Sequence, residues 1–457
     1  MPYTANYNFG VSSFIFRWGA LFLCAGIVPG QVENSIDFIY TEAPRYEPAT
    51  PGTRFPAGAA LRIVAQGQAR ALVPAFAASA DASIAFDGQR VLFAGKRKAG
   101  DPWQIWEVPA AGGAPRRVTA FNDDAVAPFY LADEWIVYSR HTPSGFQLET
   151  MPLAGGGPVV RLTYAPGDHL ATDALRDGRV LFDGPHPDAA SPRRDVYAVY
   201  PDGSGVETYR CDHGRDRHSG RQVASGDIVF EVSGKLARFT SARADQLEIP
   251  MSAGQFAGPI AETPPGEWLV AYRPDSRARY GIYRWKAGQS APDKLVASPV
   301  ANAIQPVLVA PHEVPKRHPS GLGNREGANL LCLNAYTSRS PIPADSVAAV
   351  RVWALDDAGA AVNLGQAPVE HDGSFFVQTP ADRGIRFELL DQAGKTVAAE
   401  KGWFWARRGE QRICVGCHAG PERAPDNAVP AILLRGTDPA KMLLPVHGRE
   451  TAEVRSR

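Results

Sequence analysis

Short apolar segments recur at a nearly constant spacing through the first two thirds of the chain. They begin 45, 44, 48 and 41 residues apart, and they are Val91–Phe93, Ile136–Tyr138, Val180–Phe182, Ile228–Phe230 and Leu269–Tyr272. A repeat of about 40–45 residues made of short strands is typical of the blades of a β-propeller. The spacing therefore predicts five explicit blades.

A second segment follows each of these, and its apolar residues alternate with polar ones, as in a strand with one buried face. These second segments are Trp103–Val108, Phe146–Met151, Asp195–Tyr200, Gly234–Phe239 and Tyr280–Trp285. In several repeats a glycine-marked turn then leads to an outer strand, as Gly112-Gly113 does before Arg116–Thr119.

A sixth blade is divided between the two ends of this region. Leu61–Val64 and Arg70–Val73 have the pattern of the last two strands of a blade, and Ile304–Val309 has the pattern of its inner strand. Pairing of these segments would close the ring and hide its sheet edges. We therefore expect a propeller over residues 58–311, preceded by an N-terminal extension at residues 31–57.

A second domain is expected after a linker at residues 312–325, which is rich in proline, glycine and basic residues. Its short alternating segments are Leu330–Ala335, Val347–Leu355, Gly373–Val377, Ile385–Leu390 and Thr396–Ala399. They predict a small β-sandwich within residues 326–457. The expected fold class is thus all-β: a six-bladed β-propeller followed by a small β-sandwich-like domain.

The composition agrees with this fold and excludes one class of partner. The 457 residues include 44 glycines and 39 prolines, which indicates many turns. Lys and Arg number 48, and Asp and Glu also number 48, so the formal net charge is zero. No basic field is present to attract nucleic acid, and we expect no nucleic-acid partner.

The first 30 residues predict an export signal peptide. Arg17 precedes an apolar run, Trp18–Val28, that is too short to span a bilayer as a helix, and residues of modest size follow at Val28-Pro29-Gly30. Cleavage there would give a periplasmic or otherwise exported protein. Two alternatives remain open: lipidation at Cys24, and retention of the segment as an anchor, the one case in which we expect contact with a membrane.

The candidate chemistry lies near the end of the chain, in the sequence Cys414-Val415-Gly416-Cys417-His418. Two thiols separated by two residues can each form a thioether with one porphyrin, and the adjacent imidazole can then bind the iron. The motif predicts a single covalent haem c, held by Cys414 and Cys417 with His418 as the proximal iron ligand. A redox dithiol or half of a zinc site would use similar residues, but no second CxxC is present to complete a zinc site.

Residues just before the motif are candidates for the haem surroundings. Trp403 and Trp405 could wall the macrocycle, although they could equally pack the core of the sandwich. Arg412 could pair with a haem propionate, although an exposed basic turn is the commoner reason for arginines there. Cys211 and Cys332 are expected to be buried free thiols.

The sixth iron position has three sequence candidates: Met442, His447 and His371. Thioether ligation by Met442 would suit electron transfer, whereas packing of Met442 beside Leu443 and Leu444 is the simpler alternative. A vacant sixth position is also open. It would favour small-molecule chemistry over pure electron transfer.

Polar residues before several repeats could line one mouth of the propeller. They are Asp124, His169, Asp212, His213, Arg215, Asp216, Arg217 and His218. One interpretation is a binding mouth for a small molecule or a metal; the other is that these groups cap turns and pair with one another.

Two resemblances to known families follow from these motifs. The Asp-Gly turns and R-x-T strand endings of the repeats resemble TolB-type propellers. The segments Leu330–Tyr336, Asp372–Val377, Pro380–Asp382 and Gly409–Arg412, together with CVGCH, resemble the middle domain of the hydrazine synthase alpha subunit family. This resemblance implies a propeller followed by a haem domain.

The chain departs from that family at two points. The resemblance implies that a tyrosine just after the motif ligates the iron, but Ala419–Arg423 contain no tyrosine, which returns the proximal role to His418. A second CxxCH, expected from the family's further haem domain, is also absent from the sequence.

Three functions remain in competition. The first is an exported redox protein whose haem carries electrons, with the propeller as a docking module for a redox partner protein. The second is a haem enzyme acting on a small nitrogen or oxygen species, possible as one subunit of a larger complex. The third is a binding or sensory module without catalysis.

Overall fold

The computed structural model describes residues 36–46, 58–186, 193–210, 216–251, 253–263, 266–417 and 427–444. These residues belong to one compact unit that begins at Ile36. The predicted signal peptide lies outside them. Within the described ranges, no helix is long and apolar enough to cross a membrane.

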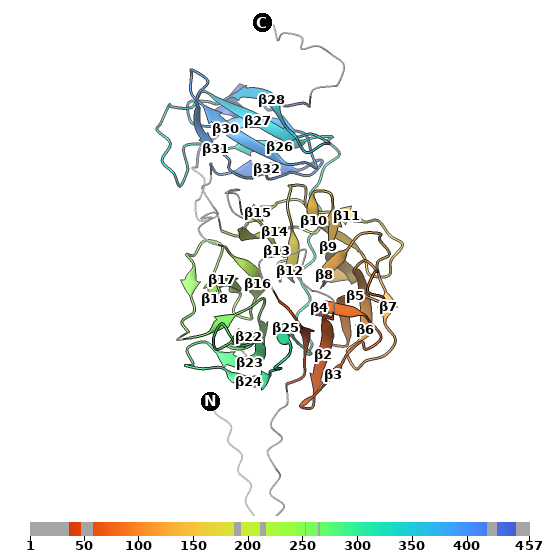
Figure 1. The fold of residues 1–457 in the computed structure, drawn as a ribbon. Helices are drawn as coiled ribbons and strands as arrows, with labels where there is room; N and C mark the ends of the chain where they lie inside the picture. Colours follow the sequence, from red (N-terminus) through yellow and green to blue (C-terminus); the bar gives the residue numbers. More distant parts are fainter. Residues whose placement is uncertain are drawn as a thin grey trace, which may run out of the picture. The chain divides into compact units, whose positions relative to one another are not determined.

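Six antiparallel sheets form the blades of the propeller (Figure 1). The first holds β4 (Ala78–Ile84), β5 (Arg90–Lys96), β6 (Gln104–Pro109) and β7 (Arg116–Arg117). The second holds β8 (Ala125–Leu131), β9 (Trp135–Thr142), β10 (Gly145–Pro152) and β11 (Val160–Arg161), with a 3-10 turn, η2 (Ala132–Glu134), between β8 and β9. The third holds β12 (Leu170–Ala174), β13 (Val180–Pro185), β14 (Arg194–Val199) and β15 (Glu207–Thr208).

The remaining three sheets complete the ring. The fourth holds β16 (His218–Gln222), β17 (Ile228–Val232), β18 (Lys235–Phe239) and β19 (Leu247–Glu248). The fifth holds β20 (Gln255–Phe256), β21 (Ala261–Glu262), β22 (Glu267–Arg273), β23 (Gly281–Lys286) and β24 (Asp293–Val296). The sixth holds β25 (Asn302–Leu308), β1 (Phe38–Ala43), β2 (Ala60–Ala65) and β3 (Gln68–Ala71). Each sheet contacts the next, and the sixth contacts both the fifth and the first.

The sixth blade contains a strand that the sequence analysis missed. β1 lies within the segment 31–57, which was expected to be an extension, yet it pairs with β25 on one side and with β2 on the other. Phe38, Ile39 and Tyr40 are buried. The sequence analysis overlooked β1 because its position does not follow the spacing of about 45 residues that marks the other blades. The ring is therefore closed by three strands from the N-terminal side and one from the C-terminal side.

The innermost strands of the blades were also assigned incompletely from sequence. The segments that set the repeat, such as Val91–Phe93, belong to the second strand of each blade, and another strand precedes them. The inner strands β4, β8, β16 and β25 carry a bulge with one residue in the left-handed region: Asp81 (φ 54), Ala127 (φ 51), Ser219 (φ 60) and Gln305 (φ 53). A bulge shifts the in-out alternation by one residue, so the period-2 signal is lost.

Two four-stranded sheets form the second domain, and the expected sandwich is confirmed. One sheet has the order β32 (Gln411–Cys414), β26 (Ala328–Cys332), β29 (Phe375–Thr379) and β33 (Ala440–Lys441). The other has the order β28 (Ala361–Pro368), β27 (Ala349–Leu355), β30 (Ile385–Leu390) and β31 (Thr396–Ala399). A short helix, α1 (Ala431–Arg435), precedes β33. The expected fold class, a six-bladed propeller followed by a β-sandwich, is thus the observed one.

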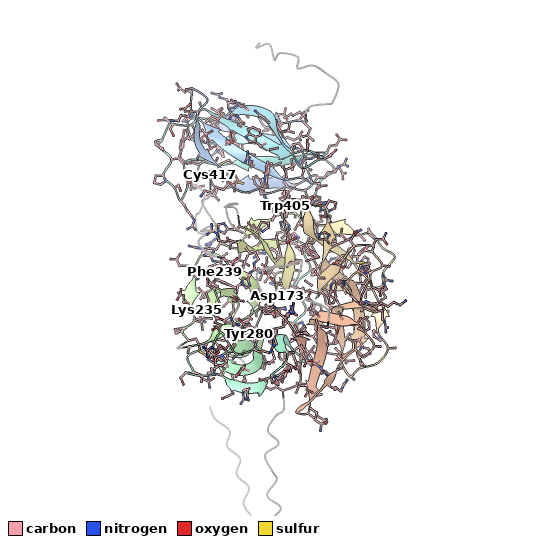
Figure 2. All side chains as sticks on the ribbon, in the orientation of Figure 1. Asp173, Lys235, Phe239, Tyr280, Trp405 and Cys417 are labelled. Atoms are coloured by element: carbon pink, nitrogen blue, oxygen red, sulfur yellow. The ribbon has the colours of Figure 1, made fainter. Side chains whose placement is uncertain are left out.

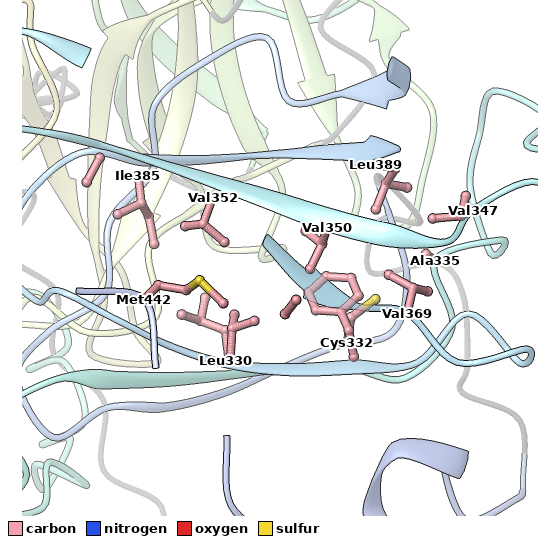
Figure 3. Close-up of a cluster of buried hydrophobic side chains, with 14 residues drawn as sticks. Leu330, Cys332, Ala335, Val347, Val350, Val352, Val369, Ile385, Leu389 and Met442 are labelled. Carbon is pink, nitrogen blue, oxygen red and sulfur yellow. The ribbon is translucent and has the colours of Figure 1, made fainter. Parts of the chain in front are cut away.

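The core between the two sheets is apolar. Leu330 and Val377 from one sheet pack with Val350, Val352 and Leu389 from the other. Figure 3 shows Met442 and Cys332 among these side chains. Both are almost fully buried, at 4% exposure.

Candidate haem site

A cavity of about 960 Å³ runs from the open edge of the sandwich to the loops of the third propeller blade. Cys414 and Cys417 line it, together with strand residues of both sandwich sheets, such as Leu330 and Phe387. The propeller contributes residues of the segments before β12 and around β14 and β15, including His169 and Tyr197. Cavities of this size hold cofactors and drug-sized ligands.

The CVGC loop is positioned by β32 and by a neighbouring turn. Cys414 is the last residue of β32, which runs parallel to β26, and Cys417 forms an isolated bridge with Ser338. Between them, Gly416 packs tightly on the turn at Asn334–Thr337. A Cβ on Gly416 would lie 2.0 Å from Thr337 O, so only glycine fits. The two cysteines are therefore held on one wall by backbone contacts.

Both thiols are protonated in their buried setting. Burial raises the pKa of Cys414, and burial together with the carboxylate of Glu400 raises the pKa of Cys417 to about 12. A reactive redox dithiol has the opposite property, a lowered pKa. The setting is that of two neutral thiols on the wall of the cavity.

Trp405 closes one side of the cavity, but it packs in the core of the propeller. It is 2% exposed and joins a cluster that includes Leu148, Leu162 and Phe182 of the second and third blades. Its Nε1 donates to Gly203 O at 3.3 Å. Trp403 also lines the cavity and is partly buried. Figure 2 labels Trp405 and Cys417 among the side chains of the chain.

Arg412 lines the cavity, but its guanidinium is occupied by protein partners. Nε lies 3.2 Å from Glu410 Oε1, and Nη2 donates to Val206 O at 2.9 Å. Glu410 in turn accepts from Gly205 N at 3.1 Å. Arg412 and Glu410 therefore tie β32 to the loop between β14 and β15.

Arg386 in β30 is an arginine of the cavity wall that the sequence analysis missed. Its guanidinium stacks over Trp403 at 5.0 Å and over Trp353 at 5.4 Å. Its Nε is buried and has no hydrogen-bond partner among the described residues. A cavity-lining guanidinium with an unused donor fits a carboxylate such as a haem propionate.

The structure places the sixth-ligand candidates away from the cavity or outside the described residues. Met442 packs in the core of the sandwich, with Leu330 and Val377, and does not line the cavity; Leu443 beside it is 66% exposed. His371 is exposed in the turn before β29 and does not line it either. His418 and His447 lie outside the described residues.

Two histidines of the third blade line the cavity. His169, directly before β12, is 2% exposed, and its Nδ1 lies 3.1 Å from Gly167 O. Burial lowers its pKa to about 4. His186, directly after β13, is 5% exposed. The sequence analysis assigned His169 to a propeller mouth and did not consider His186, because their distance in sequence from the haem motif gave no signal of proximity.

The other polar residues of the predicted propeller mouth pair with protein groups where the structure describes them. Asp216 accepts from Arg194 N at 2.7 Å, Arg217 contacts Asp195 at 3.6 Å, and Asp124 accepts from Trp103 N at 2.8 Å. His218 lies 3.5 Å from Glu231. Within the described ranges, no cluster of three or more His, Cys, Asp or Glu residues could hold a metal ion. Asp212, His213 and Arg215 lie outside those ranges, as does Cys211.

Comparisons with known proteins match this architecture. Residues 342–419 match the family model described as the hydrazine synthase alpha subunit middle domain. This part of the chain is therefore similar to the hydrazine synthase alpha subunit middle domain. The solved structure of hydrazine synthase from Kuenenia stuttgartiensis superposes with a TM-score of 0.77 at 19% identity, covering 87% of this chain and 71% of that one. At this identity the likeness shows the fold.

Other similar structures share only part of the chain. A structure described as TolB from Agrobacterium tumefaciens has a TM-score of 0.32 at 17% identity, covering 59% of this chain and 97% of that one. The tricorn protease has a TM-score of 0.37 at 13% identity, covering 72% of this chain and 35% of that one. No curated protein matches the chain.

The cavity of this chain fits a haem c. Two neutral thiols lie on one wall, Trp403 and Trp405 also line the cavity, and Arg386 offers a buried donor without a partner in the described chain. The two thiols are the groups that covalent haem attachment uses, and the arginine could pair with a propionate.

Proposed function

We propose that this chain is an exported redox protein that carries one haem c, attached through Cys414 and Cys417, and that a small molecule binds at the iron. The observation that carries the proposal is the cavity of about 960 Å³, which is lined by both motif cysteines and by aromatic side chains. A haem bound there would supply one-electron redox chemistry and a coordination site.

The residues of the chain have distinct roles in this proposal. Cys414 and Cys417 would hold the porphyrin, and His418 would bind the iron. Arg386 would pair with a propionate. Trp403 and Trp405 exclude water, which strengthens electrostatic interactions inside the cavity.

Small-molecule chemistry is favoured over pure electron transfer by the composition of the wall. The described residues that line the cavity include the imidazoles of His169 and His186 and no methionine, because Met442 lies in the sandwich core. A thioether ligand, which would raise the potential and protect the iron, is thus not supplied by Met442. The substrate class we propose is a small nitrogen or oxygen species.

Pure electron transfer is the second candidate, and Ile413 is the observation in its favour. Ile413 lines the cavity and is 65% exposed, which brings one edge of the cavity close to the surface. Electrons could enter there from a redox partner protein, which a single haem needs for any reaction of more than one electron. The export signal predicted at residues 1–30 supports a periplasmic location, where c-type haem is attached in bacteria.

The test is expression of the full chain in a host that attaches c-type haem. A peroxidase stain after denaturing electrophoresis should follow the wild-type polypeptide and disappear in the variant with both Cys414→Ala and Cys417→Ala. Cys332→Ala is the matched control and should keep the stain, because Cys332 is a free buried thiol. A wild-type protein that contains zinc and no haem would disprove the proposal.

Absorption spectra of the same preparation distinguish small-molecule chemistry at the haem from pure electron transfer. The reduced protein should bind carbon monoxide, and Met442→Leu should leave the absorption spectrum unchanged. A six-coordinate low-spin spectrum that resists carbon monoxide would favour electron transfer instead.

A further inference from the structure

The geometry points to His169 of the propeller as the residue that selects the ligand at the haem: its Nε2 accepts a hydrogen bond from an iron-bound molecule that carries an N–H or O–H group. This inference rests on the proposed haem occupancy of the cavity. It adds a function to the propeller, which would supply a ligand-contacting side chain as well as a docking surface.

His169 is held rigidly by its own loop. Its backbone N–H donates to Phe146 O at 2.8 Å, and the preceding Asp168 accepts from Phe146 N at 2.9 Å through Oδ1. The imidazole ring packs against Phe182 at a centroid distance of 5.7 Å and meets Trp405 edge-on at 5.9 Å. A side chain fixed in this way loses little entropy when it contacts a ligand.

The hydrogen bond at Nδ1 decides which ring nitrogen carries the proton. A carbonyl oxygen only accepts, so the 3.1 Å contact with Gly167 O places the proton on Nδ1. Burial keeps the ring neutral above about pH 4, because it lowers the pKa to about 4. Nε2 of a neutral, Nδ1-protonated ring has a lone pair and no proton, so it can only accept.

An acceptor on the cavity wall discriminates between ligands by their chemistry. Amines, hydroxylamines, water and peroxides can donate a hydrogen bond to Nε2, whereas carbon monoxide cannot. Loss of one such hydrogen bond lowers affinity by about three- to tenfold. The wall therefore favours protic nitrogen and oxygen ligands over aprotic diatomic ones.

The experiment compares two probes on the haem-loaded full chain: methylamine with the ferric protein and carbon monoxide with the ferrous protein. His169→Phe removes the acceptor and keeps a ring, so methylamine affinity should fall about three- to tenfold while carbon monoxide affinity stays within twofold. His169→Gln restores an acceptor oxygen and should recover part of the loss. His371→Phe, an exposed site in the sandwich, is the matched control and should change neither affinity.

Each other outcome is decisive. Equal affinities for methylamine in wild type and His169→Phe would overturn the inference while leaving the proposed haem in place. A low-spin six-coordinate wild-type spectrum that becomes five-coordinate in His169→Phe would also overturn it, because His169 would then be an iron ligand. A wild-type protein without haem would overturn both the inference and the proposed function.

Discussion

Cys332 lies directly beside Cys414, in register across the parallel pair of β26 and β32. Leu333 N donates to Cys414 O at 2.9 Å, so the pairing continues past both cysteines. A third thiol thus stands next to the two of the haem motif. Burial is the largest cause that raises the pKa of Cys332, and the nearby Cys414 and Cys417 add to it.

We predict that Cys332 stays a free thiol in the haem-loaded protein, because burial keeps its sulfur protonated and the residue is only 4% exposed, although it lines the cavity. Iodoacetamide should label Cys332 only after unfolding, and peptide mass spectrometry should find the haem on Cys414 and Cys417. A disulfide between Cys332 and Cys414 in the folded, haem-loaded protein would contradict this.

Gly416→Ala should abolish haem attachment or strongly destabilise the sandwich. The added Cβ would lie 2.0 Å from Thr337 O and 2.8 Å from Asn334 O, so the CVGC loop must leave its turn. Haem content per chain is the measurement. Gly321→Ala is the control, because a Cβ there meets nothing within 4 Å. Normal haem content and stability in Gly416→Ala would contradict the loop geometry.

Trp405→Ala should lower the free energy of unfolding by about 3–5 kcal/mol, the range for removing a large buried aromatic side chain. The loss includes contacts with Leu148, Leu162 and Phe182 of the propeller, so the variant should also become more sensitive to protease at residues 312–325. Urea unfolding and limited trypsin digestion measure the two effects. Trp405→Phe, which keeps most of the apolar contact, should show a smaller loss.

Arg386→Ala should lower the reduction potential of the haem, because a cation on the cavity wall disfavours the oxidised, more positive iron. If Arg386 stabilises the reduced haem relative to the oxidised haem by about 1.4 kcal/mol, its loss lowers the reduction potential by about 59 mV for this one-electron couple. Arg351→Ala is the control, since Arg351 pairs with Glu388 at 3.1 Å and does not line the cavity. An equal shift in both variants would contradict a specific role for Arg386.

Glu231→Gln should change how stability depends on pH. Burial raises the pKa of Glu231 from 4.5 to about 7, although Gly258 N donates to its carboxylate at 2.9 Å. As pH rises from about 4.5 to 7, the unfolded chain releases this proton while the native state keeps it. The native state therefore loses stability over this range, on the order of 3 kcal/mol from this group.

Thermal unfolding at pH 5 and pH 8 measures this effect. The decrease in melting temperature between the two values should be smaller in Glu231→Gln than in the wild type, because glutamine does not ionise and keeps an acceptor for Gly258. Glu326→Gln, at a side chain that is 95% exposed, should match the wild type. A wild-type stability that rises over this pH range with no difference from Glu231→Gln would contradict the raised pKa.

The sequence by itself determined the elements whose signal is local. The second strand of each of the five explicit blades is an almost continuously buried apolar run, and the recurrence of these runs about every 45 residues predicted the propeller. Alternating segments such as Ala349–Leu355 predicted the sandwich. The haem-binding prediction rests on the CVGCH motif, whose five residues are adjacent in the sequence. These inferences need no knowledge of which segments meet.

Only the tertiary structure decided the placements that depend on long-range packing. β1 pairs with β25 across most of the propeller sequence, Trp405 packs between propeller blades although it follows the sandwich strands, and Met442 lies in the sandwich core. His169 and Cys414 line one cavity although they are far apart in sequence. The physical reason is that the burial of a residue depends on which surfaces pack together in the folded chain. Two segments that are far apart in sequence share no periodic pattern from which their contact could be predicted.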